Sequence, residues 1–159
     1  MLDLQNRYNL TDTNNGYQFT TETGIVYFLS FIEYPPISCY LNSKTYSFCV
    51  ERNRNNNLHG LNSEKVRKTI LHTIFTFFNK NQDSLFAIYD ITDDRQDARR
   101  RLFNSWYLKY NEIDVARFSA TFQIYEKTTS AVIFFPENHP EKENIIDAFE
   151  NLKDLNFYC

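Results

Sequence analysis

Four aspartates and four arginines lie between residues 90 and 101, and their types and spacing could support chemistry. Carboxylates that follow a strand can hold Mg²⁺ in nucleases, and arginines can bind phosphate or carboxylate groups. The same aspartates can instead start a helix, with Asp93 as its N-cap and Gln96 as the capping-box partner. The cluster therefore indicates either a site or a helix start, and its spacing is compatible with both.

A predicted strand and a predicted helix position this cluster. Residues 85–89 form a continuous apolar run, which indicates a strand that is covered on both faces. Apolar residues then recur at helical spacing, at Ala98, Leu102, Phe103, Trp106 and Tyr110. At about 100° per residue, Arg95 and Arg99 fall on this core-facing stripe, whereas Arg100 and Arg101 point elsewhere.

Arg95 and Arg99 need partners on an apolar stripe, because an unpaired buried charge is costly. A structural interpretation pairs them with Asp90, Asp94 or another carboxylate. A functional interpretation makes them an anion or partner site beside a helix N-terminus at the end of a strand. We favour the structural one, because buried arginine is normally paired. The candidate binding residues are Asp90, Asp93, Asp94, Arg95, Arg99, Arg100, Arg101 and Trp106.

The run from Asp90 to Trp106 reads D-x-x-D-D-R-Q-x-A-R-x-R-L-F-x-x-W. It resembles the signature of a family of small bacterial proteins of unknown function. The resemblance extends over most of the chain and includes the aromatic-rich residues 17–31. It implies one intact domain, and it supplies no mechanism because no activity is established for that family.

The composition predicts a protein that does not bind nucleic acid through general charge. A length of 159 residues suits a single domain over residues 1–159, with residues 1–16 as a polar lead-in. The net charge of −3 disfavours nucleic acid as a partner, although a local basic patch stays open. The 15 Phe and 11 Tyr are an unusually large aromatic inventory.

Several kinds of chemistry have no signal in the sequence. The three histidines and three cysteines lack metal-ligand spacing, and neither a serine elbow nor a phosphate-binding glycine loop is present. We therefore expect neither a metal nor a cofactor. Reduced thiols are the simplest expectation for the cysteines. No apolar run has the length of a signal peptide core or a membrane span, so we expect a cytoplasmic protein.

The predicted fold is α+β, with a two-layer arrangement of a mainly antiparallel sheet and helices on one face. The element order is βββ-α-β-α-ββ-α, and the strand after the first helix is a candidate for parallel pairing. The strands are predicted at residues 17–21, 25–34, 45–51, 85–89, 117–126 and 130–135, and helices begin near residues 62, 93 and 140.

This arrangement predicts an aromatic outer surface. If helices cover one face, some of the strand aromatics must lie on the other, where contiguous rings would form a homodimer or partner surface. The residues in question are Tyr17, Phe19, Tyr27, Phe31, Tyr46 and Phe48.

Two functions from different classes follow from these observations. The first is a non-enzymatic protein-binding module that uses aromatic and arginine surfaces and binds a protein partner or a second copy of itself. The alternative is a metal-dependent nuclease or nucleotide-processing enzyme with its site in the strand-turn-helix from Asp90 to Arg101.

Overall fold

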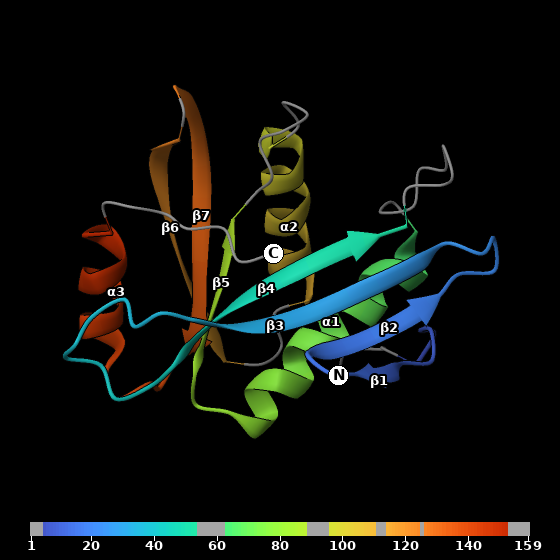
Figure 1. The fold of residues 1–159 in the computed structure, drawn as a ribbon, viewed down its shortest axis with the longest axis horizontal. Coiled ribbons are helices and arrows are strands. Elements are labelled where there is room, and N and C mark those ends of the chain that lie inside the picture. Colours follow the sequence, from blue (N-terminus) through green and yellow to red (C-terminus); the bar gives the residue numbers. More distant parts are fainter. Residues whose placement is uncertain (1–4, 54–62, 89–95, 111–113, 125, 153–159) are drawn as a thin grey trace.

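The computed structural model describes residues 5–53, 63–88, 96–110, 114–124 and 126–152. These residues form seven strands and three helices, so the fold is α+β, as predicted (Figure 1). In chain order the elements are β1 (Thr11–Thr13), β2 (Gly16–Thr20), β3 (Val26–Tyr34), β4 (Thr45–Arg52), α1 (Glu64–Lys80), β5 (Ser84–Ile88), α2 (Gln96–Tyr110), β6 (Val115–Ile124), β7 (Lys127–Pro136) and α3 (Lys142–Glu150). The short strand β1 lies within the predicted polar lead-in and was not predicted.

The strands form one mixed, mostly antiparallel sheet in the order β1-β2-β3-β4-β5-β7-β6. Neighbours along the chain form antiparallel pairs from β1 to β4, and β6 and β7 form a long hairpin. β4 and β5 are parallel, because α1 carries the chain back to the end of the sheet at which β4 begins. None of the described helices is long and apolar enough to span a bilayer.

β5 is buried on both faces, as its continuous apolar run predicts. Leu85 and Phe86 are adjacent, so their side chains point to opposite faces of the sheet. Leu85 belongs to one hydrophobic core and Phe86 to a second, and both are fully buried. β5 therefore needs a covering layer on each side.

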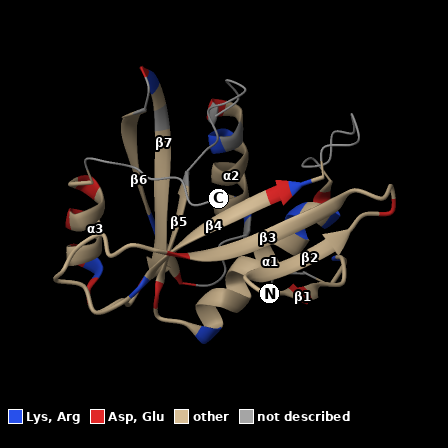
Figure 2. Cartoon of the chain, viewed as in Figure 1, with Lys and Arg blue, Asp and Glu red and all other residues tan. Residues whose placement is uncertain are grey.

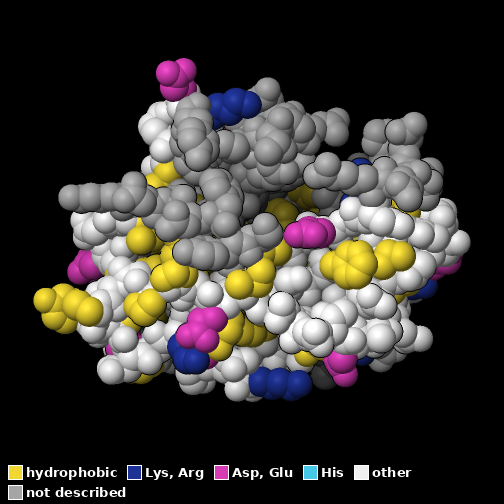
Figure 3. Space-filling view, in the orientation of Figure 1, with side chains coloured by type: hydrophobic (Ala, Val, Ile, Leu, Met, Phe, Trp, Pro, Cys, Tyr) yellow, Lys and Arg dark blue, Asp and Glu magenta, His cyan; other side chains and the backbone are white. Residues whose placement is uncertain are grey.

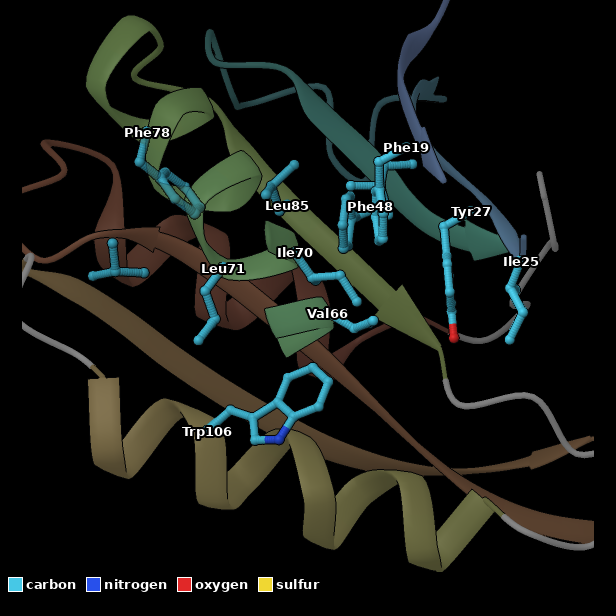
Figure 4. Packing of buried hydrophobic residues seen from close by; sticks show 12 residues of the cluster. Phe19, Ile25, Tyr27, Phe48, Val66, Ile70, Leu71, Phe78, Leu85 and Trp106 are labelled. Carbon is cyan, nitrogen blue, oxygen red and sulfur yellow. The ribbon is translucent and has the colours of Figure 1, made fainter. Parts of the chain in front are cut away.

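Two hydrophobic cores provide those layers. The first packs Val66 and Ile70 of α1 and Trp106 of α2 against strand residues that include Tyr27 and Phe48 (Figure 4). In the second core, buried residues of α3 pack against β5, β6 and β7. Its fully buried members include Phe86, Ala131, Ile133, Phe135, Ile145 and Phe149.

The prediction that all helices share one face is wrong for α3. Figure 1 shows α3 and α2 on opposite sides of β5, β6 and β7. β7 explains the difference, because Ile133 belongs to the α3 core while its neighbour Phe134 packs against the core that contains α2. Both faces of this part of the sheet are apolar, and one helix layer cannot bury both.

The predicted aromatic outer surface is also wrong. Residues directly opposite in an antiparallel pair share a face. The registers pair Phe19 with Tyr27 and Phe31 with Phe48, and they place Tyr17 opposite Leu29 and Tyr46 opposite Glu33. The six rings therefore lie on the face that α1 covers. On the view in Figure 3, apolar side chains are interspersed with polar ones.

Replacing Phe149 of α3 tests whether the second core holds α3 against the sheet. Its ring makes edge contacts with Phe86, Phe118 and Phe122, at centroid distances of 5.7, 6.0 and 5.7 Å. Phe149→Ala should lower the free energy of unfolding by about 3–5 kcal/mol, because it leaves a cavity between α3 and the sheet. Phe28→Ala, at a ring that is 39% exposed, should cost about 1 kcal/mol or less. Equal losses in urea denaturation would contradict this assignment.

Candidate functional site

The structure describes only part of the predicted site. Asp90, Asp93, Asp94 and Arg95 lie outside the described residues, and so does the side chain of Arg99. The proposed capping, ion-pairing and metal-binding roles of these residues therefore stay predictions. Arg100, Arg101 and Trp106 are described, and they lie on α2.

The two described arginines are on the surface, off the core-facing stripe. Arg100 and Arg101 are exposed, and Arg100 Nε lies 3.4 Å from Asp97 Oδ1 within the first turns of the helix. An ion pair this exposed contributes little to stability. Ala98, which the spacing placed on the core stripe, is exposed. In the described part of α2, the core stripe therefore begins at Leu102.

Trp106 is a core residue. Its side chain is 1% exposed, and its ring lies 4.8 Å from that of Phe103. Figure 4 shows it projecting from α2 toward Val66 and Leu71 of α1. The indole Nε1 is buried without a hydrogen-bond partner among the described residues. Trp106 therefore anchors α2 on the first core and does not form one surface with the arginines.

Arg117 of β6 fixes the side of α2 that faces the sheet. Its guanidinium donates a hydrogen bond to Asn104 Oδ1 and lies over the ring of Tyr107, 4.9 Å from the ring centroid. The Tyr107 hydroxyl in turn donates to the carbonyl oxygen of Val115 at 2.8 Å. Sequence reasoning missed this contact. The signal available in the sequence was Arg117 itself, the one charged residue in a strand of apolar and uncharged polar residues.

The opposite side of α2 carries an apolar residue among charged ones. Leu108 is 74% exposed. Arg101 and Leu108 are two helical turns apart, so they line one side of the helix, and Arg100 adjoins them. We call Arg100, Arg101 and Leu108 the outer face of α2, and Figure 2 shows the basic residues on this helix. It is the described part of the predicted arginine surface.

A second polar surface lies where the N-terminal segment crosses α1. Arg7, Tyr8, Asn9 and Lys65 line a hollow of about 360 Å³ together with residues of β1 and β2. The Tyr8 hydroxyl donates a hydrogen bond to Glu22, and Lys65 Nζ lies 2.7 Å from the same carboxylate and 4.3 Å from the centre of the Tyr8 ring. These contacts tie the β2–β3 turn to α1.

The electrostatics of this cluster follow from its hydrogen bonds. Burial, followed by the hydrogen bond to Glu22, raises the pKa of Tyr8 to about 12. The hydrogen bonds from Lys65 and Tyr8 lower the pKa of Glu22 from 4.5 to about 2. Tyr8 thus stays protonated and Glu22 ionised at neutral pH. Such a pair suits a structural tie better than proton transfer, for which a pKa near the working pH is preferred.

The buried His139 also has a structural role. Its Nδ1 accepts a hydrogen bond from the backbone N–H of Glu141 at 3.0 Å, so Nε2 carries the proton and donates to the carbonyl of Gln82 at 2.7 Å. The Glu141 carboxylate accepts the backbone N–H groups of Asn42 and Ser43 at 2.8 and 3.0 Å, and these bonds lower its pKa. Both side chains are used to fix loops at one end of the sheet.

The described residues contain no group of three or more His, Cys, Asp or Glu residues placed to hold a metal ion. Among the cysteines, Cys39 is a free, exposed thiol, whereas Cys49 is disulfide-bonded. The expectation of three reduced thiols is therefore wrong.

The different roles of Trp106 and Arg100 can be tested by stability. Trp106→Ala should lower the free energy of unfolding by about 3–5 kcal/mol, because it empties a site in the first core. Arg100→Ala should cost less than about 0.5 kcal/mol, because its ion pair is exposed. Urea denaturation of both variants measures the contrast. A small loss for Trp106→Ala would show that the tryptophan is not a core anchor.

The Glu22 cluster predicts a pH-dependent stability. Since folding lowers the pKa of Glu22 from 4.5 to about 2, its ionised form stabilises the folded state above that window, and this contribution is lost as the pH falls through it. Glu22→Gln should therefore lower the melting temperature more at pH 7 than at pH 3. In a Lys65→Met background the same change should have a smaller effect at pH 7. An identical decrease at both pH values would contradict the assignment.

Comparisons with known proteins assign the chain to a family. No curated protein and no solved structure matches the chain. One family model, described as a family of unknown function (DUF6169), matches residues 62–151, which is more than half of the chain. The match includes α1, the arginine-rich helix α2, the β6–β7 hairpin and α3, and it leaves out the aromatic-rich residues 17–31 to which the resemblance also extended. This chain therefore belongs to DUF6169, a family of unknown function, as the resemblance predicts.

Proposed function

We propose that this chain is a non-enzymatic protein-binding module and that the outer face of α2 contacts its partner. The observation that carries the proposal is the exposure of Leu108, at 74%, on a helix whose other side is held in the core by Trp106. Arginine is enriched in protein interfaces, and covering an exposed apolar side chain removes its surface from water, which favours binding. A rigid helix presents them without a large loss of conformational entropy on binding.

The charge of this surface indicates the chemistry of the partner. Arg101 lies two turns before Leu108 on the same side of the helix, next to Arg100 and its ion pair with Asp97, whereas the whole chain has a net charge of −3. The i, i+7 spacing of Arg101 and Leu108 matches what an amphipathic helix presents to another helix. We therefore infer a partner helix with one apolar stripe and acidic residues beside it. Opposite charges would fix its orientation and increase the association rate.

The rival proposal is a metal-dependent nuclease or nucleotide-processing enzyme that uses Asp90, Asp93 and Asp94 with the neighbouring arginines. These carboxylates lie outside the described residues, and no described contact favours this function. Mg²⁺-dependent hydrolysis of nucleic acid that is lost in Asp90→Asn would favour the enzyme. The expected cytoplasmic location also remains a proposal, and the disulfide at Cys49 removes the thiol argument for it.

The binding proposal predicts a selective loss of partner capture. Leu108→Glu keeps a good helix former but places a negative charge at the proposed contact, so it should reduce partner capture from native lysate at least tenfold. Tyr40→Glu is a matched control, because Tyr40 is 82% exposed and lies in the segment between β3 and β4, away from α2. Quantitative mass spectrometry of the captured proteins measures both.

Both variants should keep the wild-type melting temperature to within a few degrees, since each changes an exposed side chain. A captured protein that is lost with Leu108→Glu and retained with Tyr40→Glu supports the proposal. Equal capture by all three proteins would contradict it.

A further inference from the structure

β6 is a long sheet edge, and within the described residues it lacks the usual protection. The sheet order leaves β1 and β6 at the two edges, and β1 has three residues while β6 has ten. β6 pairs with β7 in an unbroken register from Val115 to Ile124, so no bulge twists it away. Arg117 is its one charged residue, and it contains neither proline nor glycine. Natural edge strands are usually short, charged, kinked or covered.

The backbone groups on the free side of β6 follow from one hydrogen bond. The N–H of Glu137 donates to the carbonyl of Asp114 at 2.7 Å, one step before the first β6–β7 pair. In an antiparallel ladder, hydrogen-bonded and non-hydrogen-bonded pairs alternate. The even-numbered residues of β6 therefore bond to β7. The odd-numbered residues from Arg117 to Gln123 direct their N–H and C=O groups away from it.

Two further observations agree with this alternation. The carbonyl of the odd-numbered Val115 accepts the Tyr107 hydroxyl, so it does not point along the β7 ladder. The side chains of Ser119, Thr121 and Gln123 are exposed, so this end of the strand is open to solvent on the α2 side. No described strand lies beyond β6 in the sheet.

We propose that β6 of a second copy of this chain adds antiparallel to this edge, with the twofold axis at Ala120. The backbone groups that point away from β7 belong to odd-numbered residues of β6. Hydrogen bonding between two copies therefore requires odd-numbered residues of one β6 to lie opposite odd-numbered residues of the other. An axis at Ala120 places Ser119 opposite Thr121 of the second copy and Arg117 opposite its Gln123. The interface is then self-complementary, as a twofold dimer requires. No like charges face each other on β6, because its single arginine meets an amide.

The aromatic residues of β6 distinguish this register from its neighbours. Phe118 and Phe122 are half-buried on the α3 face, where both contact Phe149. An axis at Ala120 places Phe118 directly opposite Phe122 of the second copy, and such cross-strand aromatic pairs stabilise sheets. An axis at Ser119 would place Phe118 opposite Ala120. The rings would then gain less from pairing.

This dimer uses the edge of the sheet and goes beyond the proposed binding by the outer face of α2. Light scattering after size exclusion tests it first. The wild-type chain should have twice the mass of one chain. Ser119→Lys/Thr121→Lys should have the mass of one chain, because each new lysine faces another across the axis. Thr11→Lys/Thr13→Lys, on exposed positions of β1, is the matched control and should remain a dimer.

A monomeric wild-type chain at all concentrations overturns the proposal. A dimer that survives the β6 variant, or one that the β1 variant abolishes, overturns it as well. Far-ultraviolet circular dichroism and thermal melts of each variant establish that the sheet is retained.

Cysteine cross-linking tests the register independently of any loss of folding. Across the axis, Ala120 would form a non-hydrogen-bonded pair with its own copy, at a Cα separation of about 4.5 Å. That separation is within the range of a disulfide. In a Cys39→Ser background, which removes the exposed thiol, Ala120→Cys should form a covalent dimer on mild oxidation. Cross-linking through Ser119→Cys or Thr121→Cys in place of Ala120→Cys overturns the register.

Discussion

The alternation of side chains along β5 and β7 is the constraint on which the rest of this structure depends. Leu85 and Phe86 are adjacent and fully buried, and so are Val132 and Ile133. Adjacent strand residues point to opposite faces, so both faces of the sheet must be covered at this point. α1 and α2 cover one face, and α3 covers the other.

The same constraint determines which surfaces are left for binding. α2 uses Trp106 and its neighbours for the core, so its opposite side presents Leu108 and two arginines to solvent. α3 and α2 cover the faces of the β6–β7 hairpin, and no described strand pairs with the outer edge of β6. The surfaces proposed for partner binding and self-association are therefore those that the packing does not use.

Local periodicity predicts much of this fold. The helical spacing before Trp106 and the apolar run of β5 both correspond to observed elements. The strand after the first helix was a candidate for parallel pairing from the element order, and it is parallel to β4. The two-sided burial of β5 was inferred from its sequence, and it already conflicts with a single helix layer. The face that α3 covers follows from long-range packing against Phe86 and Phe118, which no local pattern contains.

The sites were less predictable than the fold because they depend on registers and distant pairs. Phe19 and Tyr27 share a face because of the β2–β3 register, which strand patterns alone leave undetermined. The contacts of Tyr8 with Glu22 and of Arg117 with Asn104 join different elements. Charge type indicates that such residues need partners, but the tertiary fold determines which partners they meet.

Nuclear Overhauser effects from the Phe149 ring test the two-sided packing most directly. We expect contacts from this ring to Phe86, Phe118 and Phe122, because α3 lies on the face opposite α2. Contacts from Phe149 to Trp106 or Phe134 would instead place α3 on the same face as α2 and would rule out two-sided packing.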